Sequence, residues 1–489
     1  MVFSSVVFLF LFLPAVIALY IICPAKLRNG LLFAVSLFFY AWGEPVYIWI
    51  MLFSTVFDYT NGLLLEYFLA NKERFVNYQK YRKIVLTVSV VGNLGILCFF
   101  KYTEFLLTSL RDLTGTDIHI WKLALPIGIS FYTFQTMSYT IDVYRQKVKA
   151  QHNLIAFGMY VSMFPQLIAG PIVRYEDVAH EVRSRSHTWE NLARGLRRFI
   201  IGLSKKLLIA DVCGSVVAQV YGADASILDS RAAWLGAVCY LMQIYFDFSG
   251  YSDMAIGLGL CFGFHFRENF NYPYISSSIK EFWRRWHISL STWFREYLYI
   301  PLGGNRKGTA KTYRNKLIVF FFTGLWHGAN WTFIVWGLWH GFFIVAEDLV
   351  AKLTGKDRHS RNSKRRAAGI AKHLYTLLVV LIGFVIFRAD TMSQAVAMVA
   401  AMFSGVHATA QTGLLLAQCM TPLTLCALAA GVVFSTPVLP AILHRTDALT
   451  QNAQRAVRVL GGAVLLMLLV TDILHLSAAS YVPFIYFQF

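Results

Sequence analysis

The sequence predicts an all-helical, polytopic membrane protein, and three observations carry this prediction. The 489 residues are 57% hydrophobic and 16% aromatic but only 14% charged, whereas a soluble globular chain carries about 25% charged residues. Apolar runs recur from one end of the chain to the other, and a helix needs about 20 such residues to span a bilayer. The net charge of +18 lies mainly in short basic clusters between these runs, which is typical of cytoplasmic loops and argues against a nucleic-acid partner.

The basic clusters also give each apolar run a direction. The first run, residues 2–23, has no basic residue before it but is followed by Lys26 and Arg28, which favours a retained first span with an outside amino terminus over a cleaved signal peptide. The later runs then alternate in direction, for a total of about eleven transmembrane helices. They include residues 29–42, 46–69, 84–100, 123–143, 207–221, 232–262, 373–387, 414–434 and 459–474.

Two apolar segments break the alternation, because basic stretches flank both of their ends. Residues 154–172 are interrupted by proline and glycine, and residues 316–350 contain the turn-forming stretch 324–331. A segment that enters and leaves on the same side predicts a re-entrant piece, which must be surrounded by protein or line a water-filled cavity. His327 is therefore expected well inside the bilayer, near the tip of a hairpin that starts from the cytoplasm.

The chain shows no internal repeat and no separate soluble domain, so we expect one transmembrane domain over residues 1–489. No Lys or Arg occurs between Arg388 and Arg445, which places this stretch outside, and parity then places the carboxy-terminal tail, residues 476–489, outside as well. The seven cysteines stand apart without a C-x-x-C pair. They predict free thiols, with neither disulfides nor a metal site.

Ionisable residues inside spans are costly and are usually either functional or tightly paired. His327 stands in the sequence Leu-Trp-His-Gly-Ala-Asn-Trp. A neutral imidazole can take a proton from a hydroxyl that attacks an acyl carbon, because its pKa lies near the working pH. A core histidine satisfied by one hydrogen bond fits the position equally well.

A second polar group is the stretch Phe-Trp-Arg-Arg-Trp-His-Ile-Ser-Leu-Ser over residues 282–291. Arg284, Arg285 and the nearby Arg295 could hold phosphates bidentately at a cytoplasmic entrance, while His287 points deeper. For the arginines alone, ordinary anchoring of a span at the interface is the favoured interpretation.

A third group lies in the apolar run 232–262. Asp247 and Tyr251 are four residues apart and share a helical face. Carboxylates at this depth need partners, so we interpret them as a structural polar network that lines a cavity rather than as direct catalysts.

Five stretches in order, residues 126–132, 164–171, 245–257, 281–304 and 324–331, resemble the membrane-bound O-acyltransferases, and specifically their bacterial alginate O-acetyltransferase-like branch. The resemblance covers nearly the whole chain and is weakest over residues 391–459. It implies a funnel- or hourglass-shaped helical bundle with a catalytic core in residues 120–350. It also implies a cytoplasmic entrance for an acyl-CoA donor, which Arg284, Arg285 and Arg295 would contact, an essential His327 and an upstream polar site at His287.

The tail carries a further resemblance. Its sequence Pro-Phe-Ile-Tyr-Phe-Gln-Phe, residues 483–489, is similar to the carboxy-terminal motif of the small membrane peptide of the teichoic-acid D-alanylation system. That resemblance implies that Tyr486 carries the acyl group in transit. An aromatic anchor at the interface is the competing interpretation.

Together these features predict an O-acetyltransferase of the bacterial inner membrane. It would move acetyl from cytoplasmic acetyl-CoA towards a periplasmic partner transferase and a polysaccharide. An alginate-like polymer is the first candidate for this polysaccharide, and peptidoglycan is the second. The alternative is a transporter or flippase whose intramembrane histidines bind a substrate. Transporters commonly show paired internal repeats, and their absence here favours the enzyme.

Overall fold

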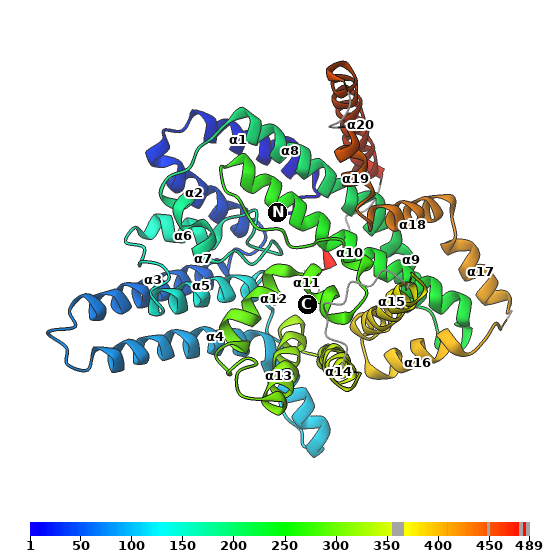
Figure 1. Cartoon of the computed structure of the whole chain (residues 1–489), viewed down its shortest axis with the longest axis horizontal. Coiled ribbons are helices and arrows are strands. Elements are labelled where there is room, and N and C mark those ends of the chain that lie inside the picture. Colours follow the sequence, from blue (N-terminus) through cyan, green and yellow to red (C-terminus); the bar gives the residue numbers. More distant parts are fainter. Residues whose placement is uncertain (355–365, 408, 447–449, 479–482, 486–489) are drawn as a thin grey trace. The chain divides into compact units, whose positions relative to one another are not determined.

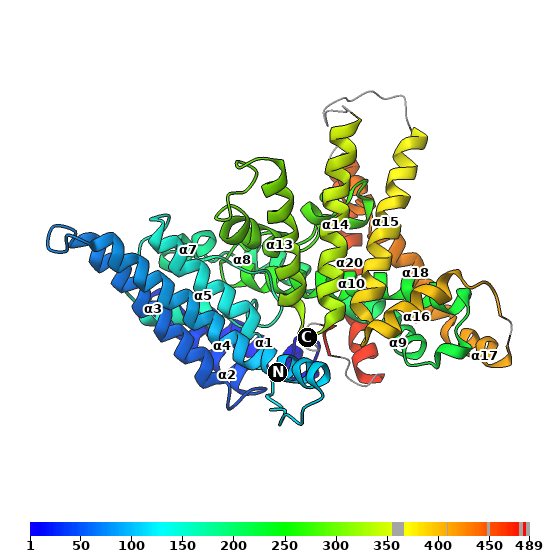
Figure 2. The same ribbon diagram turned by 90° about the horizontal axis from the view of Figure 1, so that it is seen from below.

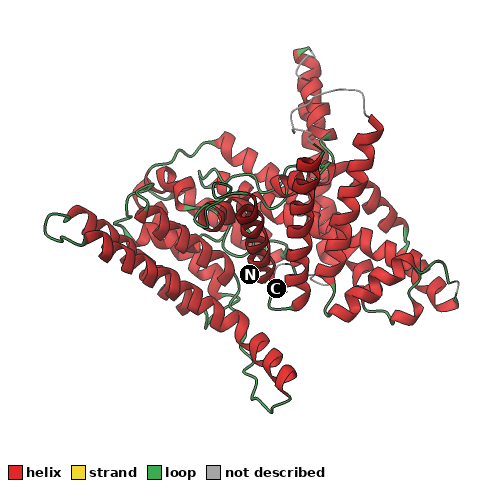
Figure 3. Ribbon diagram, turned by 60° about the horizontal axis from the view of Figure 1, so that its bottom comes forward, coloured by secondary structure: helices red, strands yellow, loops and turns green. Residues whose placement is uncertain are grey.

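Every regular element that the structure describes is a helix (Figure 3), which confirms the predicted all-helical class for that part of the chain. The structure is a computed structural model, and it describes residues 1–354, 366–407, 409–446, 450–478 and 483–485. The chain divides into two compact units. They are Met1–Phe199 with Ser252–Glu268, and Ile200–Tyr251 with Asn269–Phe489.

The first unit holds the helices of the amino-terminal part of the chain (Figure 1). In it, α3 packs against α4 and α5, and α2 packs against α6. Its elements are η1 (Phe8–Phe12), α1 (Leu13–Ile22), η2 (Ala25–Leu27), α2 (Arg28–Ala41), α3 (Ile48–Ala70), α4 (Tyr78–Thr114), α5 (Ile129–Tyr144), α6 (Leu154–Ser162), α7 (Tyr175–Arg183) and most of α8 (Trp189–Ser204).

A buried carboxylate holds three helices of this unit together. Asp58 of α3 is fully buried, and it accepts hydrogen bonds from Ser89 and Asn93 of α4, at 2.6 and 2.7 Å, and from Thr140 of α5, at 3.2 Å. A buried acceptor with several donors is stabilising, whereas the same group without donors would oppose folding. This network therefore fixes the rotation of α3 against its two neighbours.

The second unit holds the later helices, in which α13 packs along α14 and α14 packs along α15 (Figure 2). The division between the units falls within α8 and α10. The elements after α8 are η3 (Lys205–Ala210), α9 (Asp211–Tyr221), η4 (Ala225–Ile227), α10 (Ser230–Cys261), η5 (Pro273–Ile275), α11 (Ile279–Arg285), α12 (Ile288–Phe294), η6 (Arg295–Tyr299), α13 (Thr309–His327), α14 (Trp331–Leu353), α15 (Arg366–Arg388), α16 (Met392–Phe403), α17 (Ala410–Cys419), α18 (Pro422–Phe434), α19 (Val438–Thr446) and α20 (Gln451–Ala478).

Five of the described helices are long and apolar enough to cross a membrane, and the bent pair of α17 and α18 would make a sixth span. The five are Ile48–Ala70, Tyr78–Thr114, Trp331–Leu353, Gly369–Arg388 and Gln451–Ala478. The protein is therefore polytopic, but the predicted count of about eleven spans is not confirmed. Several expected spans form helices shorter than about 20 residues; the first apolar run, for example, is helical only over Phe8–Ile22.

Both segments that broke the predicted alternation are broken in the structure. The apolar run 154–172 forms the nine-residue helix α6 followed by turns, too short for a span. The run 316–350 forms a helical hairpin, α13 and α14, whose turn lies between His327 and Trp331. The turn predicted within residues 324–331 is thus confirmed.

Candidate active site

His327 is the last residue of α13, at the turn of the hairpin. The turn is set locally, because Gly328 is extended and the side chain of Asn330 caps α14 by accepting a hydrogen bond from the Thr332 N–H. The histidine is only 3% exposed. The hairpin therefore holds an imidazole inside the second unit, at the end of a rigid helix.

The hairpin depends on two glycines that let its helices approach closely. A methyl group on Gly337 of α14 would lie 2.2 Å from the carbonyl oxygen of Phe320, and one on Gly324 of α13 would lie 2.2 Å from that of Phe333. Backbone atoms cannot move aside as a flexible side chain can. Glycine is thus required on both sides of this interface.

We expect Gly337→Ala to destabilise the protein by about 1–3 kcal/mol or more, because the added methyl group overpacks a backbone contact. The measurement is the thermal unfolding midpoint of the detergent-purified protein, together with the yield in the membrane. Gly369→Ala is the matched control, since a methyl group there meets no atom within 4 Å. Equal midpoints for the two variants would contradict the packing argument.

Aromatic rings enclose the His327 imidazole. Trp326, Trp336 and Phe387 lie 5.0, 5.0 and 5.3 Å from it, between ring centroids. Such walls limit the access of water, and they offer an acyl group an apolar surface. A neutral imidazole in this setting presents a nitrogen lone pair that can take a proton from a hydroxyl.

His287 lies close by, with its ring centroid 6.4 Å from that of His327. It is fully buried, and its backbone adopts a left-handed conformation (φ 44°) directly before α12. Its Nδ1 lies 3.2 Å from Oδ1 of Asn269. The Ser289 N–H also points at this Oδ1, which identifies it as an acceptor, so His287 donates from Nδ1–H and keeps its lone pair on Nε2.

His340, on α14, is also buried, with its ring centroid 5.2 Å from that of Trp336. Neither of its ring nitrogens has a hydrogen-bond partner among the described residues. The described part of the chain also contains no cluster of three or more His, Cys, Asp or Glu that could hold a metal. The structure brings His327 and His287 together, whereas the roles predicted for them remain predictions.

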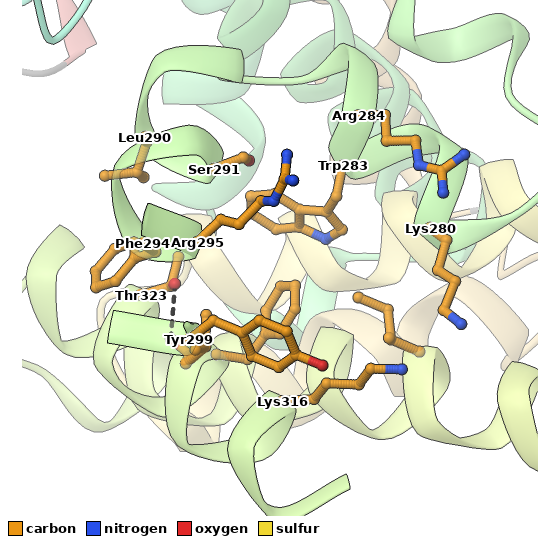
Figure 4. A pocket seen from close by; sticks show the side chains of 13 residues that line it. Lys280, Trp283, Arg284, Leu290, Ser291, Phe294, Arg295, Tyr299, Lys316 and Thr323 are labelled. Atoms are coloured by element: carbon orange, nitrogen blue, oxygen red, sulfur yellow. Dashed lines mark hydrogen bonds between the residues drawn. The ribbon is translucent and has the colours of Figure 1, made fainter. Parts of the chain in front are cut away.

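A cavity of about 280 Å³ lies beside α13 in the same unit (Figure 4). Four cationic side chains line it: Lys280 and Arg284 of α11, Arg295 at the start of η6, and Lys316 of α13. Its lining also includes Thr323, which stands four residues before His327 and so on the same helical face. The full lining is Lys280, Trp283, Arg284, Leu290, Ser291, Phe294, Arg295, Tyr299, Lys316, Val319, Phe320, Thr323 and Ile344.

The four cations are not equivalent. Lys280 and Lys316 both form ion pairs with Asp348 of α14. Arg284 and Arg295 are exposed, and neither makes an ion pair with another described residue. The two arginines are therefore available to an anionic ligand, whereas the two lysines are already paired.

The structure thus brings two of the three predicted arginines to one cavity. The third, Arg285, is not among the residues that line it, and pairs instead with Glu281 at 2.9 Å and donates to the carbonyl of Asn271. Burial raises the pKa of the Glu281 carboxyl, but hydrogen bonds from the Ser277 N–H and from Arg285 outweigh burial. The pKa of Glu281 is therefore below its usual value. Glu281 is therefore ionised at neutral pH and keeps Arg285 engaged.

Nothing in the sequence around Lys280 or Lys316 singles it out on its own, because each stands in an ordinary basic stretch. A signal was present, since Lys280 and Arg284 are four residues apart and so share one face of a helix. Tyr486 lies outside the described residues. The two residues before it, Phe484 and Ile485, are described and are 1% and 4% exposed.

Comparison with known proteins decides the family. The profile of MBOAT, the membrane-bound O-acyltransferase family, matches residues 38–389. The chain belongs to the membrane-bound O-acyltransferase family. The protein named "Probable alginate O-acetylase AlgI" of Pseudomonas putida is 42% identical over 505 residues, which cover 100% of both chains. The protein of the same name from Azotobacter vinelandii is 41% identical over 519 residues, again covering 100% of both.

A peptidoglycan O-acetyltransferase of Helicobacter pylori is 36% identical to the chain over 428 residues, which cover 81% of this chain and 78% of the relative. The expected family resemblance is thereby confirmed, and the protein is an O-acyltransferase rather than a transporter or flippase. For an O-acyltransferase, the arrangement offers a buried imidazole as a proton acceptor and, one helical turn away along α13, a cavity with free arginines.

Proposed function

We propose that this O-acyltransferase takes acetyl from cytoplasmic acetyl-CoA and passes it across the bacterial inner membrane for O-acetylation of an exported polysaccharide. The observation that carries the proposal is the placement of His327 in its aromatic enclosure, on the same helix face as a lining residue of the cationic cavity. About eleven spans in a funnel- or hourglass-shaped bundle, with both termini outside, complete the proposed topology.

The donor would occupy the cavity with its phosphates near Arg284 and Arg295. Guanidinium groups bind phosphate bidentately, and both side chains are exposed at the cavity. The aromatic lining residues Trp283, Phe294 and Phe320 offer apolar contact to the chain that leads to the thioester. Placed in this way, the thioester would point along α13 towards His327.

His327 would act as the general base. As the acceptor hydroxyl oxygen attacks the carbonyl carbon, the imidazole takes the hydroxyl proton. The new C–O bond forms, the C–S bond breaks, and the proton passes to the departing thiolate, so the products are an acetyl ester and free coenzyme A. His287 would assist from 6.4 Å away, since its hydrogen bond to Asn269 leaves Nε2 as a second proton acceptor.

The acceptor is proposed on two grounds. Relatives named alginate O-acetylase align with the whole chain, which favours an alginate-like exopolysaccharide. The relative from H. pylori favours peptidoglycan as the second candidate. In either case Tyr486 would carry the acetyl group in transit, and a periplasmic partner transferase would complete its delivery to the polymer.

The test of the proposed function has two measurements. One is the free thiol released from acetyl-CoA by the purified protein, and the other is the transfer of radiolabelled acetyl into polymer in membrane vesicles that also contain the periplasmic partner transferase. The proposal requires thiol release and labelling of one of the two polymers. Thiol release without label in either polymer would overturn the proposed identity of the acceptor. Labelling from a donor other than acetyl-CoA, with no thiol released, would overturn acetyl-CoA as the proposed donor.

Single lysine substitutions test the arginines of the donor site. We expect Arg284→Lys and Arg295→Lys each to raise the KM for acetyl-CoA roughly tenfold, because lysine keeps the charge but loses the bidentate hydrogen bonds. Arg285→Lys should have a smaller effect, since Arg285 is already engaged by Glu281. An unchanged KM in the first two variants would leave these arginines as interfacial anchors.

A further inference from the structure

The second unit contains a cluster of three ionisable side chains, of which two, Lys206 and Asp247, are buried. Lys206 of η3 is 1% exposed, and its ammonium nitrogen lies 2.5 Å from Asp211 and 2.8 Å from Oδ1 of Asp247. Two carboxylates share one ammonium group, so each has an oxygen that Lys206 does not contact. Buried charges of this kind need hydrogen-bond donors for their remaining oxygens.

The donor to the second oxygen of Asp247 comes from the end of the chain. The backbone N–H of Ile485 donates to Oδ2 of Asp247 at 2.7 Å, although 238 residues separate the two. The two carboxylate oxygens of Asp247 thus have different partners: Oδ1 holds Lys206, and Oδ2 holds the tail.

The neighbouring tail residue is held by the same elements. The ring of Phe484 packs edge-on against Tyr251, with centroids 4.9 Å apart, and the ammonium of Lys206 lies 4.7 Å from its centroid. Tyr251 stands one helical turn after Asp247 on α10 and presents the same face. A cation and an aromatic edge are both favourable neighbours for a phenylalanine ring.

Ile485 extends the contact into the aromatic interior. It belongs to the buried apolar cluster that also includes Trp336 and Phe387, and these two rings contact His327. The tail segment over residues 483–485 is therefore seated in the unit that contains the candidate active site, with a polar contact on its backbone and apolar contacts on its side chains.

We infer that Asp247, oriented by Lys206, is the anchor of the chain's own carboxy-terminal segment. It binds the backbone N–H of Ile485 and thereby holds the tail in the unit that contains the candidate active site. Only the consequence for acyl transfer, through the proposed carrier that follows Ile485 in the sequence, rests on the proposed function. Asp247 is a positioning residue in this assignment, because it acts through the tail and not on the acyl group.

Asp247→Asn tests the anchor with almost no change of shape. An amide has one oxygen and one N–H₂ group, and Lys206 attracts the oxygen. The N–H₂ group then faces the N–H of Ile485, so the acceptor for the tail is lost. The matched control is Asp472→Asn, because Asp472 is also a fully buried carboxylate of this unit and accepts from Ser204 rather than from the tail.

Hydrogen–deuterium exchange of the carboxy-terminal peptide in the purified full-length protein measures tail docking. We expect the Ile485 amide to exchange roughly 10- to 100-fold faster in Asp247→Asn, the effect of losing a hydrogen bond to a charged group. Asp472→Asn should exchange as the unsubstituted protein does. Equal exchange in all three proteins would overturn the anchor. The measurement uses neither donor nor acceptor, so its outcome is independent of the proposed chemistry.

A second pair of variants acts from the tail and leaves the sequence of the helices unchanged. Ile485→Pro removes the N–H that Asp247 binds, whereas Ile485→Val keeps it. We expect acyl transfer to fall at least tenfold in the proline variant but only slightly in the valine variant. The double variant, Asp247→Asn with Ile485→Pro, should transfer acetyl no more slowly than the more impaired of the two single variants. If the losses of activity in the two single variants multiplied in the double variant, the two substitutions would act through different contacts, and the assignment would be overturned.

Discussion

Replacement of His327 by glutamine is expected to reduce acyl transfer by ~10²–10⁴-fold, the usual loss when a general base is removed. Glutamine keeps a polar side chain of similar reach but cannot accept and release a proton at neutral pH. The imidazole is 3% exposed and enclosed by aromatic rings, so bulk water cannot readily replace it as the base. The measurement is polymer acetylation in membranes that contain equal amounts of each variant.

The matched control is His340→Gln. His340 is also buried, lies on the same hairpin and also contacts Trp336, but it has no place in the proposed chemistry. Its substitution should leave transfer within a few-fold of normal, whereas His287→Ala should impair transfer to an intermediate degree. Near-normal acetylation by a well-folded His327→Gln protein, or an equal loss in His340→Gln, would rule out His327 as the specific base.

The position of His327 could be predicted from the sequence, because charge parity and the glycine-rich stretch 324–331 require a hairpin turn there. That His327 and His340 contact the same ring could not be predicted from the sequence. On one straight helix they would face nearly opposite ways, but the turn between α13 and α14 lets both contact Trp336. A helical period applies only within one continuous helix, so it fails across the turn.

Periodicity also explains the result for the arginines. Arg284 and Arg285 are consecutive on α11, and adjacent residues of a helix lie about 100° apart around its axis. Only one of them lines the cavity, and the other meets Glu281 one turn earlier. Asp348 illustrates what a sequence does not reveal, since its pairs with Lys280 and Lys316 exist only once three helices have packed together.

The span count shows the limit of apolar runs as a guide. Hydropathy predicts where a chain is apolar, but not where its helices begin, bend or break. The run 414–434 is one apolar segment in the sequence and two helices meeting at 64° in the structure. Proline at the first position of α18 favours such a break, because it cannot donate to the preceding turn.

Tyr486→Phe is expected to stop transfer of acetyl to the polymer while the amount of protein stays the same. The substitution keeps an aromatic ring for interfacial packing and removes only the oxygen that could be acylated. Tyr481→Phe is the matched control, because it removes a phenol from the same tail five residues earlier. If the tail were only an anchor, both variants would retain full activity.

The phenol cannot act alone, because its pKa near 10 leaves it a poor nucleophile at neutral pH. It needs a base, which the proposed chemistry supplies as His327, and it needs to be brought inside the bundle. The burial of Phe484 and Ile485 against Asp247, Tyr251 and Lys206 supports the second requirement. In a strain without the periplasmic partner, mass spectrometry of the carboxy-terminal peptide should therefore show an acetyl group on Tyr486. If Tyr486 carried no acetyl group and the Tyr486→Phe protein still transferred acetyl, acetyl would pass directly to the partner or to the sugar.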